Sequence, residues 1–329
     1  MNLDLETFLT TLYVLTDDLY ESEIRKRMPS TSGPAPKLSD SEVLCLGLAA
    51  QWHRGVPWQS ERAFVRYALA HLRSYFPGMT TQSAFNRRLR RLWGAFWWLQ
   101  QVLVGRLAAA PSCEIVDSVP VRVAHGARRF KPGWLAGIAQ AGKGGTDGFF
   151  YGLRLLVAIT PDGLVTGWTM GAGNVQEHWL LELLLSTRRG QPQLGRIPSS
   201  KKDGPPRPPK EWLAPYVTAG PLRANLVLAD RGFSGANWQG HWAQQYDVAV
   251  QTPDTWPAGG LRRWFHAIRH DVETAFAHLD TVFDLECPNA HTTWGLLTRI
   301  AAKMAAYNLG VQINRLLERP DFAFASLIV

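Results

Sequence analysis

Three acidic residues stand where their side chains could act together on one substrate. Asp117 follows the short strand-like run EIV and Asp230 follows the apolar run LVLA, so each is predicted to end a buried strand. Polar groups at the strand ends of an open α/β sheet gather in one place, and we expect these two carboxylates to converge. Glu273 lies on a predicted helix beyond them. Mg²⁺ prefers oxygen ligands, so the three residues predict a divalent-metal site able to act on a phosphate.

The predicted helix around Glu273 places this residue at the border of the core. Its apolar positions, Val272, Phe276 and Leu279, recur at helical spacing on one face, and Arg269 and Glu273 lie on the adjacent polar face. Glu273 can therefore reach a site without being buried. Two alternatives stay open: an ordinary i,i+4 ion pair between Arg269 and Glu273, and plain turn or capping roles for the two aspartates.

The surrounding elements predict two structural regions. Residues 1–108 read as helices, one of which begins with a capping box at Ser39 and Glu42. Strand-like runs begin at Cys113, and Pro161-Asp162-Gly163 predicts a hairpin between two of them. A helix, further strands and two long helices follow. This order predicts an α/β domain over residues 109–329, with a mixed sheet flanked by helices. The Pro-rich basic stretch around 191–212 is interpreted as an insertion in that domain.

Composition and charge narrow the class of protein. The 329 residues are 46% hydrophobic and 19% charged, which argues against disorder. A net charge of +8 favours a polyanionic partner such as nucleic acid, although such a charge can also serve solubility alone. Three isolated cysteines predict neither a disulfide framework nor a CxxC metal site. Acidic residues near the start and charged interruptions of every apolar run predict neither a secretion signal nor a membrane span, so we expect a cytoplasmic protein.

Basic residues form two groups that could bind DNA phosphates. The first lies on one predicted helix, beside three tryptophans, and consists of Arg87, Arg88, Arg90 and Arg91. The second follows Asp117 closely and consists of His125, Arg128, Arg129 and Lys131. Arg231, next to Asp230, could contact the same strand or pair with a carboxylate. The alternatives are exposed arginines on a helix whose tryptophans are core residues, and a solvated loop.

The ordered set of motifs around the acids resembles the DDE transposases of bacterial insertion sequences, and most closely the insertion-sequence 982 family. The first motif is D-S-x-P-x-x-V, which begins at Asp117, and the second is A-D-[KR]-G-[YF], which contains Asp230. The third, R-x-x-[IV]-E-x-x-F-x-x-L, runs from Arg269 through Glu273, and R-I-x-x-K follows it at Arg299 and Lys303. The resemblance extends from about residue 8 to residue 317.

This resemblance implies a ribonuclease H-like fold in which Asp117, Asp230 and Glu273 are the catalytic residues and bind two Mg²⁺ ions, with Mn²⁺ as a substitute. It also implies DNA contacts at Arg269, Arg299 and Lys303. Related transposases often carry Lys or Arg seven residues after the catalytic glutamate, whereas this chain has Asp280. The phosphate contact expected there would then fall to Arg269 or Lys303.

The expected activity is that of a DNA transposase that binds the terminal inverted repeats of an insertion sequence, cleaves one strand and joins it to target DNA. Two element ends must meet, so we expect at least a homodimer on DNA, in association with a bacterial nucleoid. A ribonuclease H-like nuclease with another role is one alternative. A non-catalytic, domesticated DNA-binding protein is another.

Overall fold

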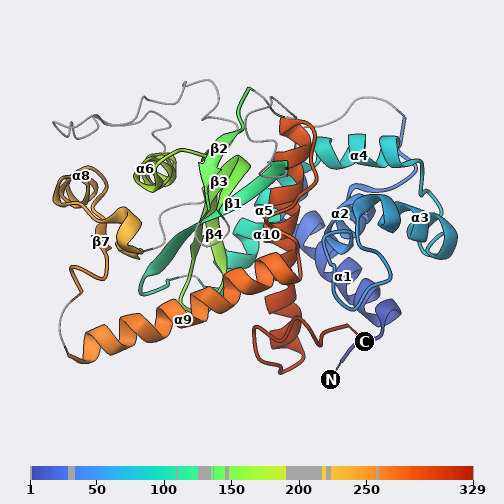
Figure 1. Ribbon diagram of the computed structural model, residues 1–329. Coiled ribbons are helices and arrows are strands. Elements are labelled where there is room, and N and C mark those ends of the chain that lie inside the picture. Colours follow the sequence, from blue (N-terminus) through green and yellow to red (C-terminus); the bar gives the residue numbers. More distant parts are fainter. Residues whose placement is uncertain are drawn as a thin grey trace. The chain divides into compact units, whose positions relative to one another are not determined.

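A computed structural model describes residues 2–28, 34–108, 110–124, 135, 137–144, 148–189, 217–219, 224–256 and 259–328. The chain divides into two compact units (Figure 1). Unit 1 comprises Met1–Leu107, Phe276–Leu285 and Thr293–Val329, and unit 2 comprises Ala108–Ala275 and Glu286–Thr292. The link between the helical region and the sheet falls near residue 108, and the C-terminal helix groups with unit 1.

Unit 1 is helical. Ser39 accepts a hydrogen bond from the Glu42 amide at 3.1 Å and Glu42 accepts one from the Ser39 amide at 2.5 Å, which confirms the predicted capping box. Residues 80–103, which carry the four clustered arginines, have the sequence pattern of one helix, but this helix is interrupted at Leu92, two residues before the poor helix former Gly94. Helices of this unit are α1 (Leu5–Leu19), α2 (Asp40–Ala49), α3 (Glu61–His71), α4 (Gln82–Arg91), α5 (Trp93–Leu107) and α10 (Thr293–Leu316).

The C-terminal helix α10 forms the centre of unit 1. It is buried along most of its length and packs against α2, α4 and α5. The two ends of the described chain also meet in this unit, because the Leu3 amide donates to the Leu327 carbonyl at 2.9 Å. No helix in the described part of the chain is long and apolar enough to cross a membrane.

Unit 2 contains a mixed sheet, as predicted. The described strands pair in the order β5-β4-β3-β1-β6-β7, with β2 added against β3. β1 pairs antiparallel with β3 and parallel with β6, and β6 pairs parallel with β7. The hairpin between β3 and β4 turns at Gly163, whose φ is 85°. The strands are β1 (Glu114–Ala124), β2 (Gln140–Lys143), β3 (Phe149–Ile159), β4 (Val165–Ala172), β5 (Val217–Ala219), β6 (Leu226–Leu228) and β7 (Ala249–Gln251).

The prediction that Asp117 ends its strand is wrong, because β1 continues for seven residues beyond it to Ala124. Those residues remain paired with β3, which runs alongside as far as Tyr151. The partner on the other edge is short: β6 pairs with β1 only up to Ile115 opposite Leu228. Asp117 and Asp230 each lie two residues beyond this pair. The parallel register therefore brings the two aspartates side by side, although only one of them ends a strand.

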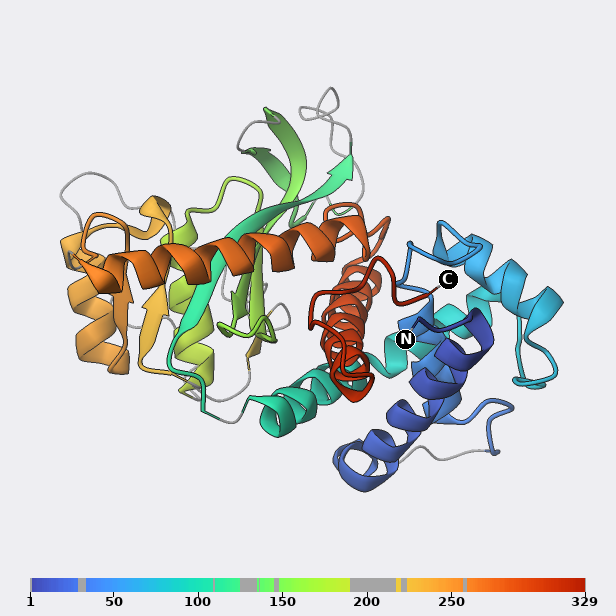
Figure 2. The same ribbon diagram turned by 90° about the horizontal axis from the view of Figure 1, so that it is seen from below.

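Helices cover both faces of this sheet. The face that carries Val116 packs against α6 (Glu177–Arg188) and α8 (Ala236–Tyr246) in one apolar cluster that includes Phe233 and Trp242. The long helix α9 (Gly260–Thr281), which contains Glu273, runs past β1, as Figure 2 shows. Its Val272 lines a cavity together with Ile115, so the first part of α9 covers the opposite face.

Two buried charged residues of α6, Arg188 and Glu182, form hydrogen bonds with the neighbouring elements. Arg188 at its C-terminal end donates to Glu114 of β1 and, at 3.0 Å, to Thr166 of β4, and both charged side chains are essentially inaccessible to water. Glu182 in the middle of α6 accepts hydrogen bonds from α8, at 3.1 Å from the Trp242 indole and 2.6 Å from the Tyr246 hydroxyl. The polar residues of α6 therefore connect it to the sheet and to its neighbouring helix.

Candidate active site

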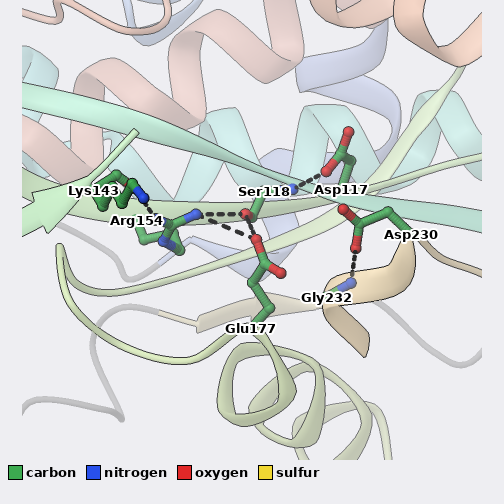
Figure 3. A network of polar contacts seen from close by, with 7 residues as sticks. All are labelled: Asp117, Ser118, Lys143, Arg154, Glu177, Asp230 and Gly232. Carbon is green, nitrogen blue, oxygen red and sulfur yellow. Dashed lines mark hydrogen bonds and ion pairs between the residues drawn. The ribbon is translucent and has the colours of Figure 1, made fainter. Parts of the chain in front are cut away.

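Asp117 and Asp230 are held in place by their own backbone neighbours. One oxygen of Asp117, Oδ1, accepts a hydrogen bond from the Ser118 amide at 2.7 Å. Asp230 caps the 3-10 turn Arg231–Phe233, and its Oδ1 accepts from the Gly232 amide at 2.7 Å. Figure 3 shows the two carboxyl groups next to each other. The capping role considered for Asp230 is therefore present, and it engages only one of its two oxygens.

Glu273 lines the same narrow cavity as the two aspartates. This cavity, of about 20 Å³, is bounded by Asp117, Asp230, Arg269 and Glu273, with Trp256 among its apolar neighbours. The Glu273 side chain is 61% exposed and its Oε1 lies 3.6 Å from Nε of Arg269. The i,i+4 ion pair considered from the sequence is thus also formed. At this exposure such a pair contributes little stability, so it does not hold Glu273 away from other partners.

The surroundings of Asp117 disfavour the negative charge of its own carboxylate. Burial, and to a lesser extent the nearby carboxylates of Asp230 and Glu177, raise the pKa of Asp117 to about 7, against the Ser118 amide and Arg269, which lower it. A carboxyl group whose charge is disfavoured by burial and by like charges gains most from a nearby cation. This is the condition expected of a metal ligand.

The donor set suits a hard divalent cation. Carboxylate oxygens at the end of a parallel strand pair match the ligand preference of Mg²⁺. Around Asp117, the stabilisation of its charge by the Ser118 amide and Arg269 does not offset the effect of burial and of the neighbouring carboxylates. As they stand, the described residues contain no group of three His, Cys, Asp or Glu side chains close enough to hold an ion. Glu273 lines the same cavity and could supply a third carboxylate.

A fourth carboxylate lies beside the aspartates, and the sequence interpretation missed it. Glu177, in the first turn of α6, accepts hydrogen bonds from the Ser118 hydroxyl and, at 3.2 Å, from Arg154 of β3 (Figure 3). In the sequence it is an acid at a helix start, which the helix dipole alone accounts for. Only the fold, which brings α6 against β1 and β3, separates it from other such residues.

The first group of predicted DNA contacts lies in unit 1, on α4. Arg87, Arg90 and Arg91 are exposed. Arg88 differs, because it pairs with Asp40 at 2.5 Å, and Asp40 also accepts a hydrogen bond from the Tyr20 hydroxyl. Arg88 therefore has a structural partner, and three arginines of α4 are available to a ligand.

The remaining predicted contacts are placed differently from one another. Arg231 is 78% exposed and lies 3.4 Å from Asp254. Arg299 pairs with Glu61 at 3.0 Å, and Lys303 is buried, with its ammonium donating to the Phe283 carbonyl. Both thus have structural partners inside unit 1 instead of a free surface. The second predicted group lies outside the described residues: His125, Arg128, Arg129 and Lys131.

Comparisons with known proteins yield only distant likenesses. No protein-family model matches the chain, and no curated protein matches it significantly. Among solved structures, the Mos1 mariner paired-end complex with Mn is 12% identical, with a TM-score of 0.20, covering 90% of this chain and 84% of that chain. A pre-cleavage Mos1 transpososome is 11% identical, with a TM-score of 0.22, covering 90% of this chain and 95% of that chain. TM-scores of this size establish neither a common fold nor a common activity. The chain is a mixed α/β protein with a helical N-terminal region.

Proposed function

We propose that this protein is a DNA transposase of the DDE type, with a ribonuclease H-like catalytic unit, that cleaves and joins DNA strands at the ends of an insertion sequence. The observation that carries the proposal is the parallel register of β1 and β6, which sets Asp117 beside Asp230 in a cavity that Glu273 also lines. The ordered sequence motifs that contain these three acids support it.

In the proposed reaction the three acids would hold divalent ions, and these would supply the contact to the reacting phosphate. When bound, Mg²⁺ would activate a water or a 3′-hydroxyl and stabilise the leaving oxygen, and Mn²⁺ would substitute. Asp117 and Asp230 would ligate the metal from neighbouring strands, and Glu273 would join them from α9. Arg269, released from Glu273, would then face the phosphate. Transposition requires the two ends of the element to meet in one complex, so we propose that the protein is a homodimer when it is bound to DNA.

A row of basic residues on α9 that ends at Glu273 supports DNA as the partner. Arg262, His266, Arg269 and Glu273 follow one another at helical spacing, so they form one stripe about 16 Å long that ends at the third acid. Arg262 and His266 are exposed, as is the neighbouring Arg263. A backbone phosphate track along this stripe would lead a strand to the three carboxylates.

Removing the two arginines at the start of α9, Arg262 on the stripe and Arg263 beside it, should weaken the salt dependence of DNA binding. For Arg262→Ala with Arg263→Ala, the slope of log K against log salt should fall by about 1 for each lost phosphate contact. Fluorescence anisotropy of end DNA between 50 and 200 mM salt would measure it. The matched control is Arg25→Ala, an exposed arginine of unit 1 paired with Glu21 at 2.6 Å. Equal slopes for all three proteins would contradict a DNA track on α9.

The test of the proposed function is cleavage of labelled DNA that carries the repeats flanking the coding sequence. We expect nicking at the repeat boundary with Mg²⁺ or Mn²⁺, none with EDTA, and a loss of roughly 100-fold in Glu273→Gln. Cleavage indifferent to the repeats would indicate a structure-selective nuclease. Binding without cleavage under every metal would indicate a non-catalytic DNA-binding protein.

A further inference from the structure

Glu177 is the centre of a polar cluster that links three elements beside the candidate site. Its Oε1 accepts from the Ser118 hydroxyl of β1 and, at 3.2 Å, from Nη1 of Arg154 on β3. The same Nη1 lies 3.1 Å from Ser118 Oγ, and Nη2 donates to the Lys143 carbonyl of β2 at 2.6 Å. The Arg154 and Glu177 side chains are largely buried, at 17% and 20% exposure. The cluster is therefore a fixed part of the fold.

The cluster acts on β1 from the face opposite to the cavity. Side chains alternate along a strand, so Asp117 and Ser118 point to opposite faces of the sheet. Asp117 lines the cavity that α9 covers, whereas Ser118 meets α6. The Ser118 amide donates to Asp117 Oδ1 at 2.7 Å. Holding the Ser118 side chain thus also fixes the amide that orients the Asp117 carboxyl.

Glu177 also bounds the turn that carries Asp230. A Cβ added to Gly232 would lie 1.9 Å from Glu177 Oε2 and 2.9 Å from Asp230 Oδ1, so both oxygens line the space beside this glycine. Because Glu177 is held through its other oxygen, it cannot easily withdraw from this position. The neighbouring residue, His178, has its Nε2 3.1 Å from the Ser234 carbonyl in the same loop. The start of α6 therefore contacts both segments that present the aspartates.

We propose that Glu177 is a positioning residue for the acid pair. With Ser118 and Arg154 it forms a clamp that fixes the Asp117 carboxyl through β1 and limits the movement of the turn after Asp230. The role requires a hydrogen-bond acceptor at Oε1 and a close fit against Gly232. It does not require Glu177 to contact the metal or the DNA. This inference rests on the proposed function, since it concerns the same three acids.

The test compares Glu177→Ala with Glu177→Gln in the metal-dependent nicking assay. Glutamine keeps a carbonyl oxygen for Ser118 and Arg154, and alanine removes it. We expect Glu177→Ala to lower the nicking rate by about 10 to 100-fold and to raise the Mg²⁺ concentration for half-maximal rate, and Glu177→Gln to stay within about fivefold of wild type. Ser118→Ala should reproduce part of the alanine defect, and the double variant Ser118→Ala with Glu177→Ala should lose less than the two single losses combined.

A carboxylate on the same helix provides the control. Glu182→Gln removes a buried acid whose hydrogen-bond partners in the described part of the chain, His241, Trp242 and Tyr246, all lie on α8. It should lower the melting temperature while the nicking rate of the folded protein stays at the wild-type value. Wild-type rates and Mg²⁺ dependence in Glu177→Ala would overturn the positioning role. Equal, severe losses in the alanine and glutamine variants would overturn it in favour of a direct metal ligand. Absence of nicking by wild type would count against the proposed function and would be seen before any variant is compared.

Discussion

Asp117→Asn is expected to lower DNA nicking by at least about 10³-fold while leaving DNA binding intact. Asparagine has nearly the shape of aspartate and can still accept from the Ser118 amide, but it offers a divalent ion one neutral oxygen in place of a charged carboxylate. The measurement is single-turnover nicking of labelled end DNA, with anisotropy to confirm binding. Asp162→Asn, an exposed aspartate in the β3–β4 hairpin, is the matched control and should nick like wild type. Cleavage near the wild-type rate in Asp117→Asn would remove Asp117 from the catalytic set.

The same variant should be more stable than wild type without metal at pH 8. The folded-state pKa of Asp117 is raised to about 7 from an ordinary 3.8, so the folded protein holds this proton more tightly than the unfolded chain. Stability is therefore lost as the pH rises from about 4 to about 7, and the loss is complete above pH 7. Asparagine has no such loss. We expect a gain on the order of 4 kcal/mol at pH 8 and almost none near pH 4.

Urea denaturation in EDTA at several pH values would measure this gain. Addition of Mg²⁺ should narrow the difference in unfolding free energy between Asp117→Asn and wild type, because an ion that binds only the folded wild type stabilises it. If the difference in unfolding free energy between Asp117→Asn and wild type were the same at pH 4 and pH 8, the pKa of Asp117 would not be raised in the folded protein.

Glu114→Ala is expected to be the most destabilising single change considered, at about 3–5 kcal/mol. The change leaves the Arg188 guanidinium buried without its carboxylate partner. Glu114 lies on β1, three residues before Asp117. Urea denaturation followed by circular dichroism would measure it. The informative control is the double variant Glu114→Leu with Arg188→Met, which replaces the pair by apolar side chains and should recover most of the loss. A single variant that costs less than about 1 kcal/mol would mean that water or another group replaces the carboxylate.

The sequence predicted the elements of this fold better than their ends. Apolar spacing found α1, α6, α9 and α10, and turn residues found the β3–β4 hairpin. The end of β1 was missed because an acidic residue after an apolar run looks like a strand end, and only pairing with β3 shows that the strand continues past Asp117. Helix α8 was not predicted, since its tryptophans and glutamines give no clear apolar stripe.

For the candidate site, the sequence pointed to three acids that line one cavity, but it could not separate exposed basic residues from paired ones. The motifs that contain Asp117, Asp230 and Glu273 are local, and the structure lines one cavity with all three. An arginine or lysine has the same letter whether it faces water or a carboxylate. Arg88 and Lys303 were grouped with exposed basic residues because their partners, Asp40 and Phe283, are not adjacent to them in the sequence. Glu177 was missed for the same reason.

The grouping of α10 with the N-terminal helices sets the order in which this protein can be completed on the ribosome. Helices α2, α4 and α5 pack against α10, which begins 200 residues after α5 begins. All strands of the described sheet, and the three acids, leave the ribosome before α10 does. The apolar side of α5 therefore needs another cover in the nascent chain until α10 has left the ribosome. A messenger cut short before α10 would yield the strands and acids of the candidate site without a finished helical unit.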